Sequence, residues 1–254
     1  MYNQIYSIVN DFIKAVEQDK NFSVLLKNWN GKRGPKRKLS ITQVMSLNLL
    51  RFTIHIKDLK AFHRIVKSME LLPDMPNYEN FLKASNKSFP IIALFMQLLL
   101  VQNQLQNETG LHFIDSTPIS TCLTRRIFSH KVTKEFASRG KSTKGWFYGF
   151  KLHGVCSEKG LLESVVFTSG NINDSKMVEQ VTKNMKCRFF CDAGYLKKTK
   201  ELIELAKTGR FIYAATRQNM NRLMTCEQWE HLRNRNIIES DWGVLKQNYF
   251  LEYH

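Results

Sequence analysis

Three acidic residues stand in apolar surroundings that do not account for them. Asp115 follows the stretch LHFI, Asp192 follows RFFC, and Glu239 follows Ile237 and Ile238 in a basic, apolar stretch. A buried carboxylate without a partner is costly, so each of these acids calls for a reason. Carboxylates collected from different elements suit magnesium, which prefers hard oxygen ligands and, in pairs, assists phosphodiester chemistry on DNA.

Each acid also has an ordinary structural interpretation. Asp115 and Asp192 could form turns at the ends of strands, and Glu239 could be an exposed residue paired with a basic neighbour. Asp174, in SGNINDSKM, is a rival for the second position. It follows Gly170 where a loop enters a helix, however, and this place suits an N-cap or an Asx turn. We therefore rank Asp174 below Asp192.

The overall charge favours a polyanionic partner. The chain has 254 residues and 38 Lys and Arg against 22 Asp and Glu, which gives a formal net charge of +16. Nucleic acid is the first candidate and an anionic membrane surface the second. The longest apolar run, 91–101, is interrupted by Gln97 and is shorter than the roughly 20 residues that a membrane span needs. We expect a buried helix there, no membrane partner and a cytoplasmic protein.

Basic side chains gather between residues 125 and 151, where they face a single acid, Glu135. Phosphate contacts of this kind give salt-dependent affinity rather than sequence choice, although a solvated basic loop is the alternative. His130 and His153 could also contact DNA, but a hydrogen-bonded structural role is more common. On the expected last helix, basic side chains one and two turns from Glu239 could bind phosphate beside it. The candidate DNA-binding residues are Arg125, Arg126, Lys131, Lys134, Arg139, Lys141, Lys144, Lys151, Arg235 and Lys246.

The first 105 or so residues are predicted to be helical. Apolar residues recur at helical spacing, and Ser40 with Gln43 forms a capping-box pair before one segment. A further helix is expected to start near Ser88 and Pro90. The basic stretch GKRGPKRK before the capped helix could help to place that helix in a DNA major groove. A helical bundle for dimer contacts is an equal alternative, and the basic stretch could be a linker.

The pattern changes at Leu111 to alternating strands and helices. We expect strands at 111–120, at 145–170 with a hairpin turn at 158–160, at 188–195 and at 210–216. Helices are expected at 175–185, at 197–209 and from 226 onward. This order predicts a mixed α/β layer. Neighbouring strands in its sheet would place Asp115 and Asp192 side by side. The five cysteines have no paired CxxC spacing, which favours reduced thiols over a zinc site.

Five ordered motifs resemble a known family: FIDSTPIS, RGKSTKGWFYGFKLHGV, TSGNINDSK, CDAGY and RNRNIIESDWGVLKQ. They look like bacterial insertion-sequence transposases of the DDE type, closest to insertion sequence family nine-eight-two. The resemblance implies an RNase H-like mixed sheet flanked by helices in residues 109–254, preceded by a small all-helical domain in residues 1–108 for DNA-end binding or dimerisation. It also implies that Asp115, Asp192 and Glu239 are the catalytic, metal-binding acids.

The same resemblance implies a cofactor, partners and a place in the cell. Magnesium, for which manganese can substitute, would support cleavage at the element's ends and strand transfer into target DNA. The partners would be the terminal inverted repeats, the target DNA and a second copy in a homodimer on DNA, in the bacterial cytoplasm at the nucleoid. Arg235, Glu239 and Lys246 keep the spacing of the family's signature, whereas its Tyr position holds Leu232. Family members usually continue further, so we expect a C-terminally truncated chain.

Three functions remain open at this point. The first is an active DDE transposase. The second is a truncated, inactive DNA-binding remnant or repressor. The third is an RNase H-like nuclease of recombination or repair, which would cut branched or hybrid substrates without preference for element ends.

Overall fold

The structure is a computed structural model that describes residues 1–27, 29, 36–143, 145–216 and 223–252. The chain divides into two compact units, Met1–Leu98 and Leu99–His254, and each is described by itself. Most of the basic stretch GKRGPKRK and one candidate DNA-binding residue, Lys144, lie outside the described residues.

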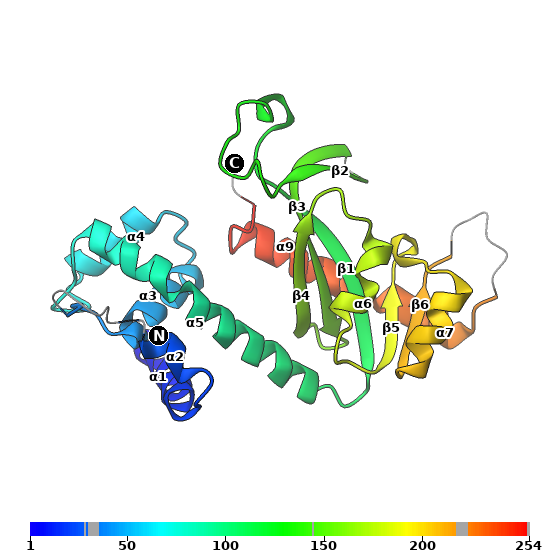
Figure 1. Ribbon diagram of the computed structural model, residues 1–254, viewed down its shortest axis with the longest axis horizontal. Helices are drawn as coiled ribbons and strands as arrows, with labels where there is room; N and C mark the ends of the chain where they lie inside the picture. The colour runs from blue at the N-terminus through cyan, green and yellow to red at the C-terminus, as the bar shows by residue number, and fades with distance from the viewer. Residues whose placement is uncertain (28, 30–35, 144, 217–222, 253–254) are drawn as a thin grey trace. The chain divides into compact units, whose positions relative to one another are not determined.

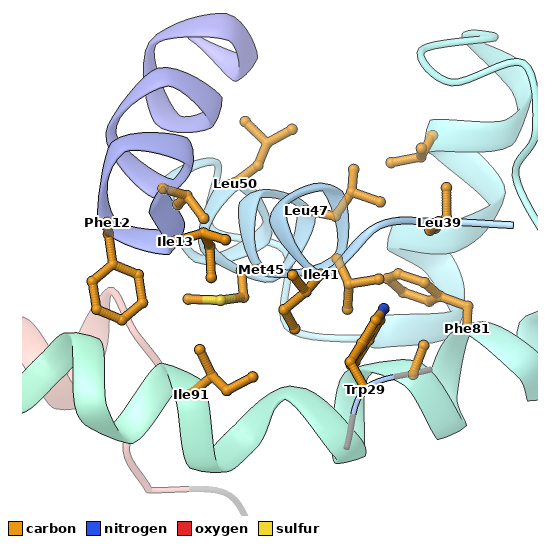
Figure 2. Close-up of a cluster of buried hydrophobic side chains, with 14 of the residues drawn as sticks. Phe12, Ile13, Trp29, Leu39, Ile41, Met45, Leu47, Leu50, Phe81 and Ile91 are labelled. Carbon is orange, nitrogen blue, oxygen red and sulfur yellow. The ribbon is translucent and has the colours of Figure 1, made fainter. Parts of the chain in front are cut away.

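Helices build the first unit. Ser40 and Gln43 form the predicted capping box: the Gln43 N–H donates to the Ser40 hydroxyl, and the Ser40 N–H donates to the Gln43 side chain. The core side chains converge from several helices (Figure 2), with Met45, Leu47 and Phe81 fully buried. The helices are α1 (Tyr2–Gln18), α2 (Ser23–Lys27), α3 (Ile41–Thr53), α4 (Leu59–Ser68) and α5 (Tyr78–Leu105), which continues into the second unit.

Helix α5 runs without a break through Pro90, so the prediction of a separate helix starting near Ser88 is wrong. A proline inside a helix removes one backbone hydrogen bond. Tertiary packing overrides this cost here, because the next residue, Ile91, is 2% exposed in the first unit's core. By length and composition alone α5 could cross a membrane, which is weak evidence for a span. The expectation of a buried helix at 91–101 is wrong for most of this stretch, because Leu98 and Val101 are 47% and 46% exposed.

The second unit contains a six-stranded mixed sheet in the order β2-β3-β1-β5-β6, with β4 also paired to β3. The pairs β2–β3, β3–β1 and β3–β4 are antiparallel, whereas β1–β5 and β5–β6 are parallel. The strands are β1 (Leu111–Ser120), β2 (Ser138–Ser142), β3 (Gly145–Ser157), β4 (Leu162–Ser169), β5 (Cys187–Cys191) and β6 (Arg210–Ala214).

Helices cover both faces of this sheet (Figure 1). Side chains alternate along a strand, so Ile114 packs with α6 and α7 whereas Phe113 packs with α8 and α9. The same alternation separates Phe189 from Phe190 on β5. The helices are α6 (Val178–Val181), α7 (Thr199–Lys207), α8 (Cys226–Asn234) and α9 (Asn236–Gln247), with short 3-10 turns at Thr124–Arg126, Asp174–Met177 and Ala193–Tyr195. The mixed α/β prediction is confirmed.

The predicted hairpin between β3 and β4 is present, with Gly160 at a φ of +74°. Two other features differ from the sequence analysis. Strand β2 was not predicted, because SRGKS lacks apolar alternation and becomes a strand through its pairing with the edge of β3. The last helical stretch is two helices, α8 and α9, which meet at Arg235. No disulfide joins the five cysteines, all of which are described.

Candidate active site

Asp115 and Asp192 come from neighbouring parallel strands. In the β1–β5 register Ile114 lies opposite Cys191, and the next residue in each chain segment is the aspartate. Asp115 lies within β1, whereas Asp192 follows β5 and precedes a 3-10 turn. Because side chains alternate, Asp115 shares the face of Phe113, which packs with α8 and α9. The strand neighbourhood expected from the sequence is present.

Glu239 reaches this face because α9 packs beside Asp115. Ile238 and Trp242 of α9 are 0% and 4% exposed and belong to the core on this side of the sheet. The Trp242 ring lies over Gly154, where an added Cβ would be 2.4 Å from the ring. Gly154 is in turn the register partner of Asp115. This close approach of helix to strand fixes the first turn of α9, which carries Glu239.

Arg235 joins two of the acids. Its guanidinium lies 3.4 Å from Asp115 Oδ1 and 2.9 Å from Glu239 Oε1. Lys246, at the other end of α9, donates to the Pro118 carbonyl oxygen at 2.7 Å. Arg235 therefore bridges β1 and α9 directly at the acids, and Lys246 ties the far end of α9 to the same strand.

The electrostatics of Asp115 reflect both other acids. The Asp115 side chain is 17% exposed. The pKa of its carboxyl is raised to about 6, above all by burial and in smaller part by the negative charges of Glu239 and Asp192. Arg235 and a hydrogen bond with the Ser116 backbone lower the pKa and offset part of this rise. Two acids that are distant in the sequence therefore lie close enough to Asp115 to act on it.

Comparison with known proteins identifies this unit. Residues 105–254 match a family model described as a transposase DDE domain. The chain belongs to this transposase family. No curated protein and no solved structure gave a match. The DDE domain thus covers the whole sheet, α6 to α9 and all three acids, and membership of the family implies DNA binding.

The donor set of the transposase fits a divalent cation in its chemistry. Asp115, Asp192 and Glu239 offer hard carboxylate oxygens, the ligands that magnesium prefers. Within the described residues, however, no group of three or more His, Cys, Asp or Glu side chains is close enough to hold a metal ion. Arg235 supplies positive charge between two of the acids instead. Metal binding therefore requires side-chain rearrangement around Arg235.

The rival acid, Asp174, belongs to a different cluster. It pairs with Lys151 Nζ at 2.9 Å, and its Oδ1 lies 3.8 Å from His153. His153 is fully buried, with its Nε2 2.9 Å from the Thr168 hydroxyl and its Nδ1 3.4 Å from the Tyr195 hydroxyl. The N-cap role that the sequence analysis considered for Asp174 belongs to Asn173. Asn173 caps the 3-10 turn whose first residue is Asp174.

Tyr195 is a site-supporting residue that the sequence analysis missed. It is 1% exposed and packs in the core on the α6 and α7 side of the sheet. Burial, above all, raises the pKa of its hydroxyl well above the ordinary value. The available signal was an aromatic residue three positions after Asp192, at the end of the short turn that follows β5. Tyr195 anchors the turn that follows Asp192.

The predicted DNA-binding residues differ in their surroundings. The Lys151 side chain is 13% exposed. Its ammonium forms an ion pair with Asp174 and donates a hydrogen bond to the Ile172 carbonyl oxygen. His130 is hydrogen-bonded to Thr133. Most of the remaining basic residues of the segment are open to solvent: Arg125, Arg126, Lys131, Lys134, Arg139 and Lys141.

Proposed function

We propose that this chain is an insertion-sequence transposase in which Asp115, Asp192 and Glu239 are the catalytic, metal-binding acids. Its reaction would be metal-dependent cleavage at the ends of the element, followed by strand transfer into target DNA. The observation that carries the proposal is the convergence of the three acids: the β1–β5 register sets Asp192 beside Asp115, and Arg235 bridges Asp115 and Glu239. The family match over residues 105–254 supplies the reaction class.

An RNase H-like core is part of this proposal. Three antiparallel strands, β4, β3 and β1, continue into two parallel strands, β5 and β6, and helices cover both faces. Asp115 lies on the central strand β1, Asp192 just after its parallel neighbour β5, and Glu239 on α9, which packs against β1 and β3. Five ordered motifs also support membership of insertion sequence family nine-eight-two.

The residues of the chain would share the work as follows. Asp115, Asp192 and Glu239 would hold magnesium, for which manganese can substitute. When bound, such ions activate water for attack on phosphorus and neutralise the developing charge. Arg235, released from Glu239, would have a guanidinium free to bind the scissile phosphate in a bidentate manner. Asp115 must lose its proton before it can act as a ligand, so its raised pKa makes the proton compete with the metal and favours metal binding at higher pH.

We further propose that the DNA partners are the terminal inverted repeats and the target, bound in the cytoplasm at the nucleoid by a homodimer. The formal net charge of +16 and the exposed basic segment before β3 support a polyanionic partner. The helical first unit would bind the DNA ends or form dimer contacts.

Three variants test the assignment: Asp115→Asn, Asp192→Asn and Glu239→Gln. The substrate would be duplex DNA from either side of the chain's own coding sequence, with magnesium, manganese or a chelator. We expect each variant to bind this DNA as the wild type does but to cut it at least 1000-fold more slowly, a loss on the scale of the electrostatic contributions that active-site groups make. Glu230→Gln, an exposed acid on α8, is the matched control and should cut normally.

The outcomes separate the alternatives. Wild-type cutting by the three variants would refute the site. Binding without cleavage by the unmodified chain, at any concentration of either metal, would favour an inactive DNA-binding remnant. Cleavage of branched DNA or RNA–DNA hybrids with no preference for the flanking DNA would favour a nuclease of recombination or repair.

A further inference from the structure

The connection between β1 and β3 exposes large aromatic rings among its basic side chains. Phe128 is 91% exposed and Trp146 is 66% exposed. The guanidinium of Arg139 lies 5.5 Å from the centre of the Phe128 ring, and the ammonium of Lys141 lies 5.8 Å from that of Trp146. Each exposed ring is therefore accompanied by a cation at a distance suited to cation–π attraction.

These four residues form one continuous surface, which we call the aromatic–basic strip. Lys141 and Trp146 are register partners in the β2–β3 ladder, so their side chains lie on the same face. Arg139, two residues before Lys141, shares that face and connects it to Phe128. The opposite face of this ladder carries Phe147, which is 7% exposed. The strip is thus the outer face of an otherwise packed hairpin.

We propose that the aromatic–basic strip binds DNA with an unstacked or single-stranded base, whose face stacks on Trp146 or Phe128 while Arg139 and Lys141 contact the neighbouring phosphates. The proposal deepens the proposed function and rests on it. Exposed rings with cations beside them suit a ligand that offers both aromatic faces and negative charge, and single-stranded nucleic acid offers both.

Charge decides between this partner and a second copy of the chain. In a two-fold interface the same patch of both copies meets. The positive charges of the strip and its basic neighbours on one copy would therefore face the same positive charges on the other copy. A purely apolar protein partner would bury the charges of Arg139 and Lys141 without offering them an opposite charge. A polyanion removes both penalties.

The strip lies away from the acids along β3. Gly154 is the register partner of Asp115, whereas Tyr148 and Trp146 are the register partners of Arg139 and Lys141. At about 3.4 Å per residue these two pairs lie roughly 20–27 Å along the strand from Asp115. The strip would therefore contact nucleotides at a distance from the bond held at the acids.

Binding of the full chain to fluorescently labelled oligonucleotides tests the proposal. The probes are a roughly 20-nucleotide single strand and the fully paired duplex of the same sequence, compared by fluorescence anisotropy over a range of salt concentrations. Phe128→Ala and Trp146→Ala should each weaken single-strand binding by about 5- to 100-fold. Duplex affinity and the slope against salt should change little, because no charge is removed.

Two matched variants sharpen this experiment. Phe167→Ala removes a ring that is 59% exposed on β4, outside the strip, and should leave binding to both probes unchanged. Arg139→Gln should weaken binding to both probes and reduce the salt slope by about one phosphate contact.

Several results would overturn the proposal. It fails if the ring variants bind the single strand as the wild type does, or lose duplex and single-strand affinity equally. Sedimentation that shows the ring variants dissociating a wild-type dimer would assign the strip to protein contacts. Loss of binding to phosphatidylserine vesicles, with DNA binding intact, would assign it to a membrane. No readout involves cleavage, so an inactive chain that keeps this selectivity would refute the proposed catalysis but not the strip.

Discussion

Gly154→Ala should displace the helix that carries Glu239. The added methyl group would lie 2.4 Å and 2.8 Å from two atoms of the Trp242 ring. Ordinary carbon contacts begin near 3.5 Å, so the ring and α9 must retreat by about 1 Å. Overpacking of this kind costs about 1–3 kcal/mol of unfolding free energy. A misplacement of about 1 Å can also cost about 100-fold in rate. The variant should therefore cleave about 100-fold more slowly and also lose about 1–3 kcal/mol of unfolding free energy.

The assay combines urea unfolding with metal-dependent cleavage of the flanking duplex. Gly243→Ala is the matched control on α9 itself, because a Cβ at Gly243 meets nothing within 4 Å. It should stabilise the protein by about 0.5–1 kcal/mol, as alanine is the better helix former, and leave cleavage intact.

A double variant makes the test independent of simple misfolding. Trp242→Leu removes the ring that opposes the new methyl group, so Gly154→Ala should cost less in this background, with a coupling of about 0.5–3 kcal/mol. Wild-type cleavage by Gly154→Ala alone, or strictly additive effects in the double variant, would refute the argument that this contact positions Glu239.

Three further predictions concern buried charge. Glu163→Gln should lower the unfolding free energy by about 3 kcal/mol in urea titrations, because the fully buried Glu163 pairs with His112 at 2.6 Å; an effect below 0.5 kcal/mol would contradict it. The folded-state pKa of Asp115 is raised from 3.8 to about 6, so the native state binds the carboxyl proton of Asp115 more tightly than the unfolded chain does. The contribution of this proton to the unfolding free energy is complete below pH about 4 and is lost as the pH rises through about 6. Asp115→Asn should thus stabilise the metal-free protein by up to about 3 kcal/mol at pH 7 and hardly at pH 4, with Glu230→Gln as control; equal effects at both pH values would exclude this origin. Arg235→Gln should raise the pKa of Asp115 above 6 in an NMR titration, and an unchanged value would show that the bridge has no electrostatic role.

Much of the candidate site could be predicted from local sequence. Asp115 and Asp192 each follow an apolar run, and a buried strand that ends in an acid is unusual on energetic grounds alone. Glu239 was recognisable from Ile237 and Ile238 before it, which predicted that one side of its helix is buried. The rank of Asp174 below Asp192 stays a prediction, and the structure adds that Asp174 pairs with Lys151.

Features that depend on contacts between distant segments could not be predicted. Strand β2 has a basic, polar sequence and forms through pairing with β3. The continuity of α5 through Pro90 depends on the burial of Ile91 rather than on local propensity. Lys151 has the same appearance in the sequence as Lys141, yet the fold gives it a carboxylate partner and removes most of its exposure.

The sequence by itself determined most of the strands and helices after Leu111, the excess of positive charge and the three candidate acids, because hydrophobic periodicity and composition are properties of short segments. The tertiary structure decided how those acids meet. The parallel register of β1 and β5 sets Asp115 beside Asp192, and the absence of a side chain at Gly154 lets Trp242 bring α9 against β1. Arg235 then holds Asp115 and Glu239 together, an arrangement that arises through long-range packing and electrostatics.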